Sequence, residues 1–76
     1  SIMDMASVES ESGYAYEYVS RLPENYRVAI DLFYYEQIPT EQIAEIMKTR
    51  PATVRSYLHR GRAKIKEMME ADAYVG

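Results

Sequence analysis

Four polar side chains near the middle of the chain have types and a spacing that suit the reading of a DNA groove. They stand at positions i, i+1, i+4 and i+5, so on a helix they share one face: Arg55, Ser56, His59 and Arg60. Arginine can donate a forked pair of hydrogen bonds to guanine O6 and N7, and serine can serve either type of base. Histidine can donate to a base or to a phosphate. The spacing therefore predicts a base-reading face on one helix.

These four residues lie within a segment that carries only positive charge. Residues 48–66 hold seven lysines and arginines and no acid, whereas residues 1–47 have a net charge of −7 and residues 67–76 of −3. A basic run is usually a solvated face, but nineteen residues without one acid are unusual in a chain of net charge −3. We therefore expect this segment to contact a polyanion, and the acidic remainder to orient the domain as it approaches.

The same segment offers groups for the DNA backbone on both sides of the base-reading residues. Free backbone N–H groups at the start of a helix bind phosphate, and the residues at that point are Thr49, Arg50 and Thr53. The cations that follow the base-reading residues can reach the flanking phosphates; they are Arg62, Lys64 and Lys66. We expect these six residues to contact the DNA backbone.

The elements that must position these side chains are helices, because the apolar residues recur with a helical period and show no strand-like alternation. The pattern predicts helices over residues 14–22, 23–37, 40–47 and 51 to about 71, with Thr40 as the cap of the third and a tight turn over residues 48–50. The fold class is therefore all-α, a small four-helix domain over residues 14–76. Residues 1–13 are rich in serine and glutamate and are predicted to be a flexible tail or linker.

The third and fourth predicted helices are joined by only a few residues, which is the spacing of a helix-turn-helix. In that arrangement the second helix enters the major groove by its N-terminal part, where the base-reading residues stand. We expect the third helix to bury Ile43, Ala44, Ile46 and Met47. The apolar stripe expected on the fourth helix consists of Val54, Tyr57, Leu58, Gly61, Ile65, Met68 and Met69.

The composition disfavours several other classes of function. The 76 residues suffice for one small domain, and the absence of cysteine excludes disulfides and thiolate metal sites. His59 is the only histidine, so neither a histidine metal cluster nor a Ser-His-Asp triad is convincingly completed. No nucleophile–base pair or Gly-rich phosphate loop is present, so we expect neither an enzyme nor a cofactor. No leader or apolar run of about 20 residues appears, so the chain is expected to be cytoplasmic, without a membrane partner.

Residues 22–67 resemble region 4 of bacterial sigma-70 family factors, especially the extracytoplasmic-function group. The motifs that carry the likeness are LP at residues 22–23 with Arg27, EQIAEI at residues 41–46, and TVRSxLHRxR at residues 53–62. The resemblance implies a helix-turn-helix domain that binds the −35 element of double-stranded promoter DNA in bacterial transcription initiation. It also implies docking on the flap of the RNA polymerase β subunit.

The resemblance further assigns roles to residues and names partners. It implies that bases are read by the residues matching Arg55, Ser56, His59 and Arg60, and that the match to Arg62 holds the backbone. An apolar groove formed by the first helices would receive the flap tip, and an anti-sigma factor could cover the same surfaces. The sequence lacks region 2 of such factors, so we expect the chain to be one domain of a longer factor.

Six positions in the turn and the fourth helix depart from the family pattern: Lys48, Thr49, Arg50, Ala52, Tyr57 and Gly61. Lys48 stands where a glycine is common, which predicts a turn that differs in detail. Tyr57 stands where arginine is usual and removes one possible phosphate contact. Gly61 stands where alanine is usual, at a cost of about 1 kcal/mol in helix propensity.

Two alternatives share the helical scaffold. A LuxR-type output domain has a similar four-helix layout and binds DNA as a dimer, so an inverted-repeat footprint would distinguish it. A helix-turn-helix kept only as a protein-interaction module, for example toward an anti-sigma factor, would bind a partner tightly and DNA not at all.

Overall fold

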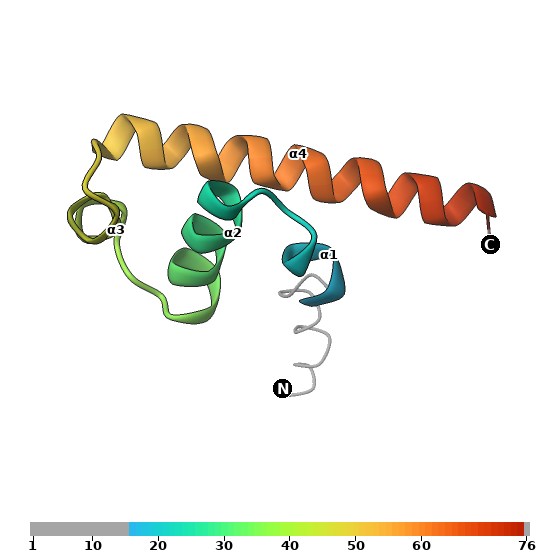
Figure 1. Cartoon of the computed structure of the whole chain (residues 1–76), viewed down its shortest axis with the longest axis horizontal. Helices are drawn as coiled ribbons and strands as arrows, with labels where there is room; N and C mark the ends of the chain where they lie inside the picture. Colours follow the sequence, from blue (N-terminus) through green and yellow to red (C-terminus); the bar gives the residue numbers. More distant parts are fainter. Residues whose placement is uncertain (1–15, 76) are drawn as a thin grey trace.

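The computed structural model describes residues 16–75, and within them it contains helices joined by short connections and no strand. The elements are α1 (Tyr16–Ser20), α2 (Glu24–Ile30), the π-helical turn η2 (Asp31–Tyr35), α3 (Thr40–Met47) and α4 (Pro51–Val75). Figure 1 shows α4 running the length of the molecule, with α1, α2 and α3 arrayed along one side of it. The predicted all-α class is confirmed. The predicted tail over residues 1–13 and the first two residues of the predicted first helix lie outside the described residues.

The core is a row of apolar side chains between α4 and the other three helices. The underside of α4 contributes Val54, Leu58 and Ile65, all buried, at the spacing i, i+4, i+11 that keeps residues on one helical face. The opposing helices contribute Val19, Ala29, Ile30, Ile43 and Ala44. Each of the three shorter helices thus buries its apolar side against α4, which makes α4 the common support of the fold.

Two residues predicted to be buried are exposed. Ile46 on α3 is 55% exposed, because the buried side of α3 is centred between Ile43 and Ala44, and Ile46 points about a quarter-turn or more away from it. Met69 on α4 is 45% exposed, because beyond Ile65 only the five-residue α1 packs under α4, and Met68 takes that contact. These two predictions were wrong, whereas the remaining apolar residues predicted for α3 and α4 are buried or half-buried.

α4 runs to Val75, about one turn further than its predicted end near residue 71. A contact with α1 accompanies this extension: the Tyr18 hydroxyl donates to Asp72 Oδ2 at 2.5 Å. The carboxylate raises the pKa of Tyr18, because a hydrogen bond and a nearby negative charge both favour the protonated phenol. The last turns of α4 are therefore tied to the first described helix.

The turn between α3 and α4 confirms the tight turn predicted over residues 48–50 and has a defined hydrogen-bond pattern. Lys48 adopts the left-handed conformation, with φ 58° and ψ 49°. Its N–H donates to the Glu45 carbonyl at 3.2 Å, and the Thr49 N–H donates to the Ala44 carbonyl at 2.8 Å. These are the two bonds of a Schellman motif, in which glycine usually holds the left-handed position. A lysine here thus keeps the turn, at a steric cost that glycine avoids.

The start of α3 differs from the prediction. Pro39 stands at the N-cap position with extended backbone, its carbonyl accepts the Ile43 N–H, and no side chain caps the helix. Thr40 is the first helical residue rather than the cap, so its predicted capping role was wrong. The fixed φ of Pro39 sets the entry to the helix in place of a side-chain cap.

The second predicted helix, over residues 23–37, is continuous in outline but changes register in its second half. After Ile30 the helix widens into η2, and the Glu36 N–H donates to the Asp31 carbonyl, five residues back, at 3.1 Å. The Ile38 N–H then reaches the Leu32 carbonyl at 2.9 Å, past Gln37 in the left-handed conformation. The apolar period contained no signal for this wide turn, which rotates every later side chain relative to an unbroken α-helix.

Gly61 marks the closest approach of α4 to α2. A Cβ added to Gly61 would lie 2.6 Å from Ile30 Cδ1 and 3.4 Å from Tyr26 Cβ. Gly61 is itself buried, and Ile30 is fully buried. The glycine therefore lowers the helix propensity of α4 but allows a closer contact between the two helices.

Paired changes at Gly61 and Ile30 test this close contact. Gly61→Ala gains about 1 kcal/mol of helix propensity but places its methyl against Ile30 Cδ1. Ile30→Val removes that carbon at a cost of about 0.5–1.5 kcal/mol. We expect the change in the free energy of unfolding caused by Gly61→Ala to be more favourable by about 1 kcal/mol or more in the Ile30→Val background than in the wild type. Urea unfolding measures this free energy. If the two changes add within about 0.5 kcal/mol, the contact does not require glycine.

Candidate nucleic-acid interface

The outward side of α4 carries two parallel stripes of polar and cationic side chains. At spacings of three and four residues, the first stripe consists of Arg55, His59, Arg62 and Lys66. The second stripe, on the neighbouring face, consists of Thr53, Ser56, Arg60 and Lys64. Together they hold all of the base-reading residues predicted on α4 and all of the predicted backbone residues within it.

The structure leaves most of the long side chains of both stripes accessible. The exposed members are Arg55, His59, Arg60, Lys64 and Lys66, and the half-buried members are Thr53, Ser56 and Arg62. Beneath them Val54 and Leu58 are 0% and 4% exposed. The first two turns of α4 are thus anchored on one side and present cations on the other.

The other two residues predicted to contact the DNA backbone, Thr49 and Arg50, lie directly before the first turn of α4. Pro51 is its first residue, and the Arg50 carbonyl accepts the Val54 N–H at 3.0 Å. Arg50 is exposed and Thr49 is half-buried. No acidic residue stands in the first turn, so the partial positive charge of the helix N-terminus is not offset there.

Arg62 has a partner that the sequence did not predict. Its Nη1 donates to the Tyr34 hydroxyl of η2 at 2.8 Å in a part-buried contact. The two residues are 28 positions apart, and the wide turn of η2 decides where Tyr34 lies, so no local pattern could have paired them. The predicted backbone residue Arg62 is therefore a half-buried, oriented side chain rather than a free one.

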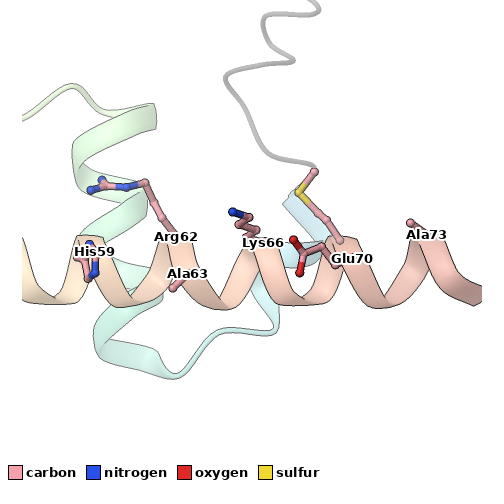
Figure 2. A pocket seen from close by; sticks show the side chains of 7 residues that line it. His59, Arg62, Ala63, Lys66, Glu70 and Ala73 are labelled. Carbon is pink, nitrogen blue, oxygen red and sulfur yellow. The ribbon is translucent and has the colours of Figure 1, made fainter.

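A hollow of about 640 Å³ follows the first stripe toward the C-terminal half of α4. Figure 2 shows the side chains that line it, rising from one side of α4, with the Arg62 guanidinium lying over the pale-green helix. The lining consists of His59, Arg62, Ala63, Lys66, Met69, Glu70 and Ala73. Its floor is largely apolar, and three of the first-stripe residues stand along it.

A second hollow, of about 440 Å³, lies away from α4 between α1 and the helix formed by α2 and η2. Tyr16 and Tyr35 meet edge-on across it, with ring centroids 6.1 Å apart. The other residues that line it are Val28, Asp31, Leu32 and Glu36. This surface is aromatic, aliphatic and acidic, in contrast with the cationic stripes.

Asp31 in the second hollow is held in a poor environment for a charge. Its Oδ1 is buried without a hydrogen-bond partner among the described residues. Burial raises the pKa of Asp31 and Glu36 raises it further, while the positive charge of Arg27 opposes them. The carboxylate thus lowers the stability of the folded state at neutral pH.

Neither a metal cluster nor a membrane span is formed by the part of the chain that the structure describes. Within residues 16–75 no group of three or more histidine, cysteine, aspartate or glutamate side chains could hold a metal ion. No helix in that range is long and apolar enough to span a bilayer.

Comparison with known families identifies the scaffold. The family described as "Sigma-70, region 4" matches residues 12–65, a range that contains α1, α2, η2, α3 and both stripes up to Lys64. The chain belongs to the sigma-70 region 4 family. The arrangement of α3, the Schellman turn and α4 is thus the helix-turn-helix of a region 4 domain, and the match favours this family over the LuxR-type alternative.

Two curated relatives of this region 4 domain carry sigma-factor names. It is 35% identical over 51 residues to the "ECF RNA polymerase sigma factor SigM" of Bacillus subtilis (strain 168). The aligned residues make up 67% of this chain and 31% of the relative. It is 28% identical over 57 residues to the "RNA polymerase sigma factor SigZ" of the same strain, covering 75% of this chain and 32% of the relative. The extracytoplasmic-function type expected from the sequence is thus confirmed. The chain spans about a third of the length of these relatives, and no solved structure matches it.

Replacing Asp31 by Asn tests the electrostatics of the second hollow. The change keeps the size of the side chain and removes the charge that burial disfavours. Because the pKa of Asp31 is raised, the folded state binds its proton more tightly than the unfolded chain does. The stability linked to this group is therefore present below its unfolded pKa and is lost as the pH rises through the folded pKa. We expect Asp31→Asn to have a higher urea midpoint than the wild type at pH 7.

The pH dependence distinguishes this cause from a change in packing. The difference between Asp31→Asn and the wild type should shrink toward pH 4, because the wild-type carboxyl then gains its proton. Glu67→Gln, at an exposed residue of α4 outside the second hollow, serves as the control for the loss of one negative charge. An advantage of Asp31→Asn that stays constant from pH 4 to pH 7 would rule out the buried charge as its source.

Proposed function

We propose that this region 4 domain recognises the −35 element of promoter DNA in bacterial transcription initiation. The observation that carries the proposal is the build of α4, whose underside is fixed by Val54 and Leu58 while its outward side presents two cationic stripes. A helix held in this way can enter the major groove without losing its packing. The names of the sigma-factor relatives support a role in transcription.

The N-terminal turns of α4 are the proposed base-reading part. Arg55 and Arg60 lie on different stripes, so their guanidinium groups can meet base pairs on either side of the helix axis, with Ser56 and His59 between them. All but Ser56 are exposed. The remaining predicted residues are proposed to hold the phosphates; they are Thr49, Arg50, Thr53, Arg62, Lys64 and Lys66.

The charge distribution supports a single orientation on DNA. Residues 48–66 carry a net charge of +7 while the rest of the chain is acidic. A duplex therefore attracts the outward side of α4 and repels the helices beneath it. The site requires no cofactor, and we propose a binding domain without catalytic activity that acts in the cytoplasm, where promoters lie.

We also propose how the chain is organised. Residues 14–76 form the region 4 domain, and residues 1–13 serve as a linker or tail. The chain spans about a third of its named relatives, which supports the proposal that it is one domain of a longer factor.

DNA binding gives the direct test of the proposal. If about four phosphates are neutralised, the logarithm of the binding constant should fall with the logarithm of salt concentration at a slope of about −3 to −4. Arg55→Ala or Arg60→Ala should cost about 1–3 kcal/mol on the preferred site and relax the preference at one base position. Fluorescence anisotropy, with sites selected from a random DNA pool, measures both effects.

Lys64→Ala is the matched control for a phosphate contact. It should weaken binding to all sequences alike and make the salt slope shallower by about 1, without changing the selected site. A folded domain whose affinity does not respond to salt would contradict promoter binding. Tight binding to an anti-sigma factor with no measurable DNA affinity would favour the interaction-module alternative.

The second hollow is the proposed docking surface for the flap of the RNA polymerase β subunit. It combines the aromatic rings of Tyr16 and Tyr35 with Val28 and Leu32, and such apolar and aromatic groups form the centres of protein interfaces. It lies on the acidic helices and is separate from the cationic stripes. An anti-sigma factor could compete for the same surface.

Separate variants should uncouple the two proposed surfaces. Tyr35→Ala removes a 45% exposed ring from the second hollow and should weaken binding to an isolated β flap by about 1–2 kcal/mol, with DNA affinity unchanged. Arg55→Ala should do the reverse. Titration of labelled flap and labelled DNA against each variant measures both. Equal losses on both partners would show that Tyr35→Ala acts through the fold.

A further inference from the structure

The side chain of Tyr34 links η2 to the cationic stripes. Its hydroxyl accepts a hydrogen bond from Arg62 Nη1 at 2.8 Å, and the contact is part-buried. Figure 2 shows the Arg62 side chain directed away from Lys66 and Glu70, with its nitrogen atoms over the neighbouring helix. The direction of the Arg62 side chain on the first stripe is thus set by another element, η2.

The wide turn of η2 explains why a tyrosine is available at that point. A π-turn inserts an extra residue, which rotates the side chains after it by about 100° compared with an unbroken α-helix. The ring of Tyr34 is also fixed by Phe33, edge-on at 5.0 Å between centroids and 85° between planes. The hydroxyl is therefore held by the backbone turn and by a neighbouring ring before Arg62 reaches it.

The chemistry of this pair suits a phosphate contact better than an ion pair would. Arginine has five N–H donors, so one bond to Tyr34 leaves others for a second acceptor. A neutral phenol orients the guanidinium without cancelling its charge, whereas a carboxylate would compete with phosphate for it. Arg62 lies seven residues beyond Arg55 on the same stripe, about 10 Å further along α4, which suits a flanking phosphate.

We propose that Tyr34 is a positioning residue for DNA binding, because it holds the Arg62 side chain in the orientation that meets a backbone phosphate. This inference rests on the proposed promoter-binding function. A long side chain that is ordered before binding loses less freedom on forming the complex, so the hydroxyl of Tyr34 raises affinity without touching DNA. The domain thereby uses a residue of its second helix to tune a contact made by its fourth.

The test is a cycle of Tyr34→Phe, Arg62→Ala and the double variant in the 76-residue chain. We expect Tyr34→Phe to weaken binding to a −35-type duplex about threefold to tenfold, the scale set by immobilising one long side chain. Arg62→Ala should make the salt slope shallower by about 1. In the Arg62→Ala background, Tyr34→Phe should change affinity by less than about twofold, because the side chain it positions is gone.

Controls separate positioning from folding and from the proposed function itself. Tyr26→Phe removes a hydroxyl from the same helix, from a ring that packs on Tyr57, and should leave DNA affinity unchanged. Circular dichroism should show the same helix content in all variants. An equal loss from Tyr34→Phe with and without Arg62 would overturn the inference, as would wild-type or tighter binding by Tyr34→Phe. If the wild type itself fails to bind DNA in a salt-dependent way, the promoter-binding proposal fails first.

Discussion

The packing of one long helix over three short ones is the constraint on which the rest of the structure depends. α4 buries Val54, Leu58, Gly61 and Ile65 against the helices beneath it, and the absence of a side chain at Gly61 lets it lie directly against Ile30. A five-residue and a seven-residue helix are too short to be stable alone in water, so α1 and α2 depend on this contact. The same contact fixes the rotation of α4 about its axis, and thus which side chains face outward.

That rotation connects the core to the electrostatics. Once Val54 and Leu58 face inward, Arg55, His59 and Arg60 must face solvent, because residues on one helix keep fixed angles to each other. The acids of the chain lie mainly before residue 48, on the helices below. The domain therefore has a positive outer helix on an acidic base, and its core alone decides which side a polyanion can approach.

The sequence predicted those features that depend on local pattern. The bounds of α3, the turn at Lys48 and the buried underside of α4 all follow from apolar spacing and proline positions, and the structure confirms them. Met69 was predicted wrongly because its burial depends on how far α1 extends beneath α4, which the period of a single helix does not contain. Ile46 was predicted wrongly because the buried side of α3 is centred between Ile43 and Ala44, and Ile46 points away from it. The pairing of Arg62 with Tyr34 could not be predicted from the sequence, because it depends on a π-turn that the spacing of apolar residues does not indicate. The family motifs predicted that the candidate interface lies on α4, but they did not indicate which residues orient its side chains.

η2 joins the two proposed surfaces through adjacent residues. Tyr34 reaches Arg62 on the first stripe, while Tyr35 lines the second hollow and meets Tyr16. In an unbroken α-helix, consecutive residues also point about 100° apart, but the wide turn sets which directions these two take. Asp31, at the start of η2, keeps a buried oxygen without a hydrogen-bond partner in residues 16–75, which is a cost that an optimally stable helix would not carry. A local structure that lowers stability and yet orients one residue toward each surface is more readily explained by binding than by folding, because folding alone would favour the regular helix.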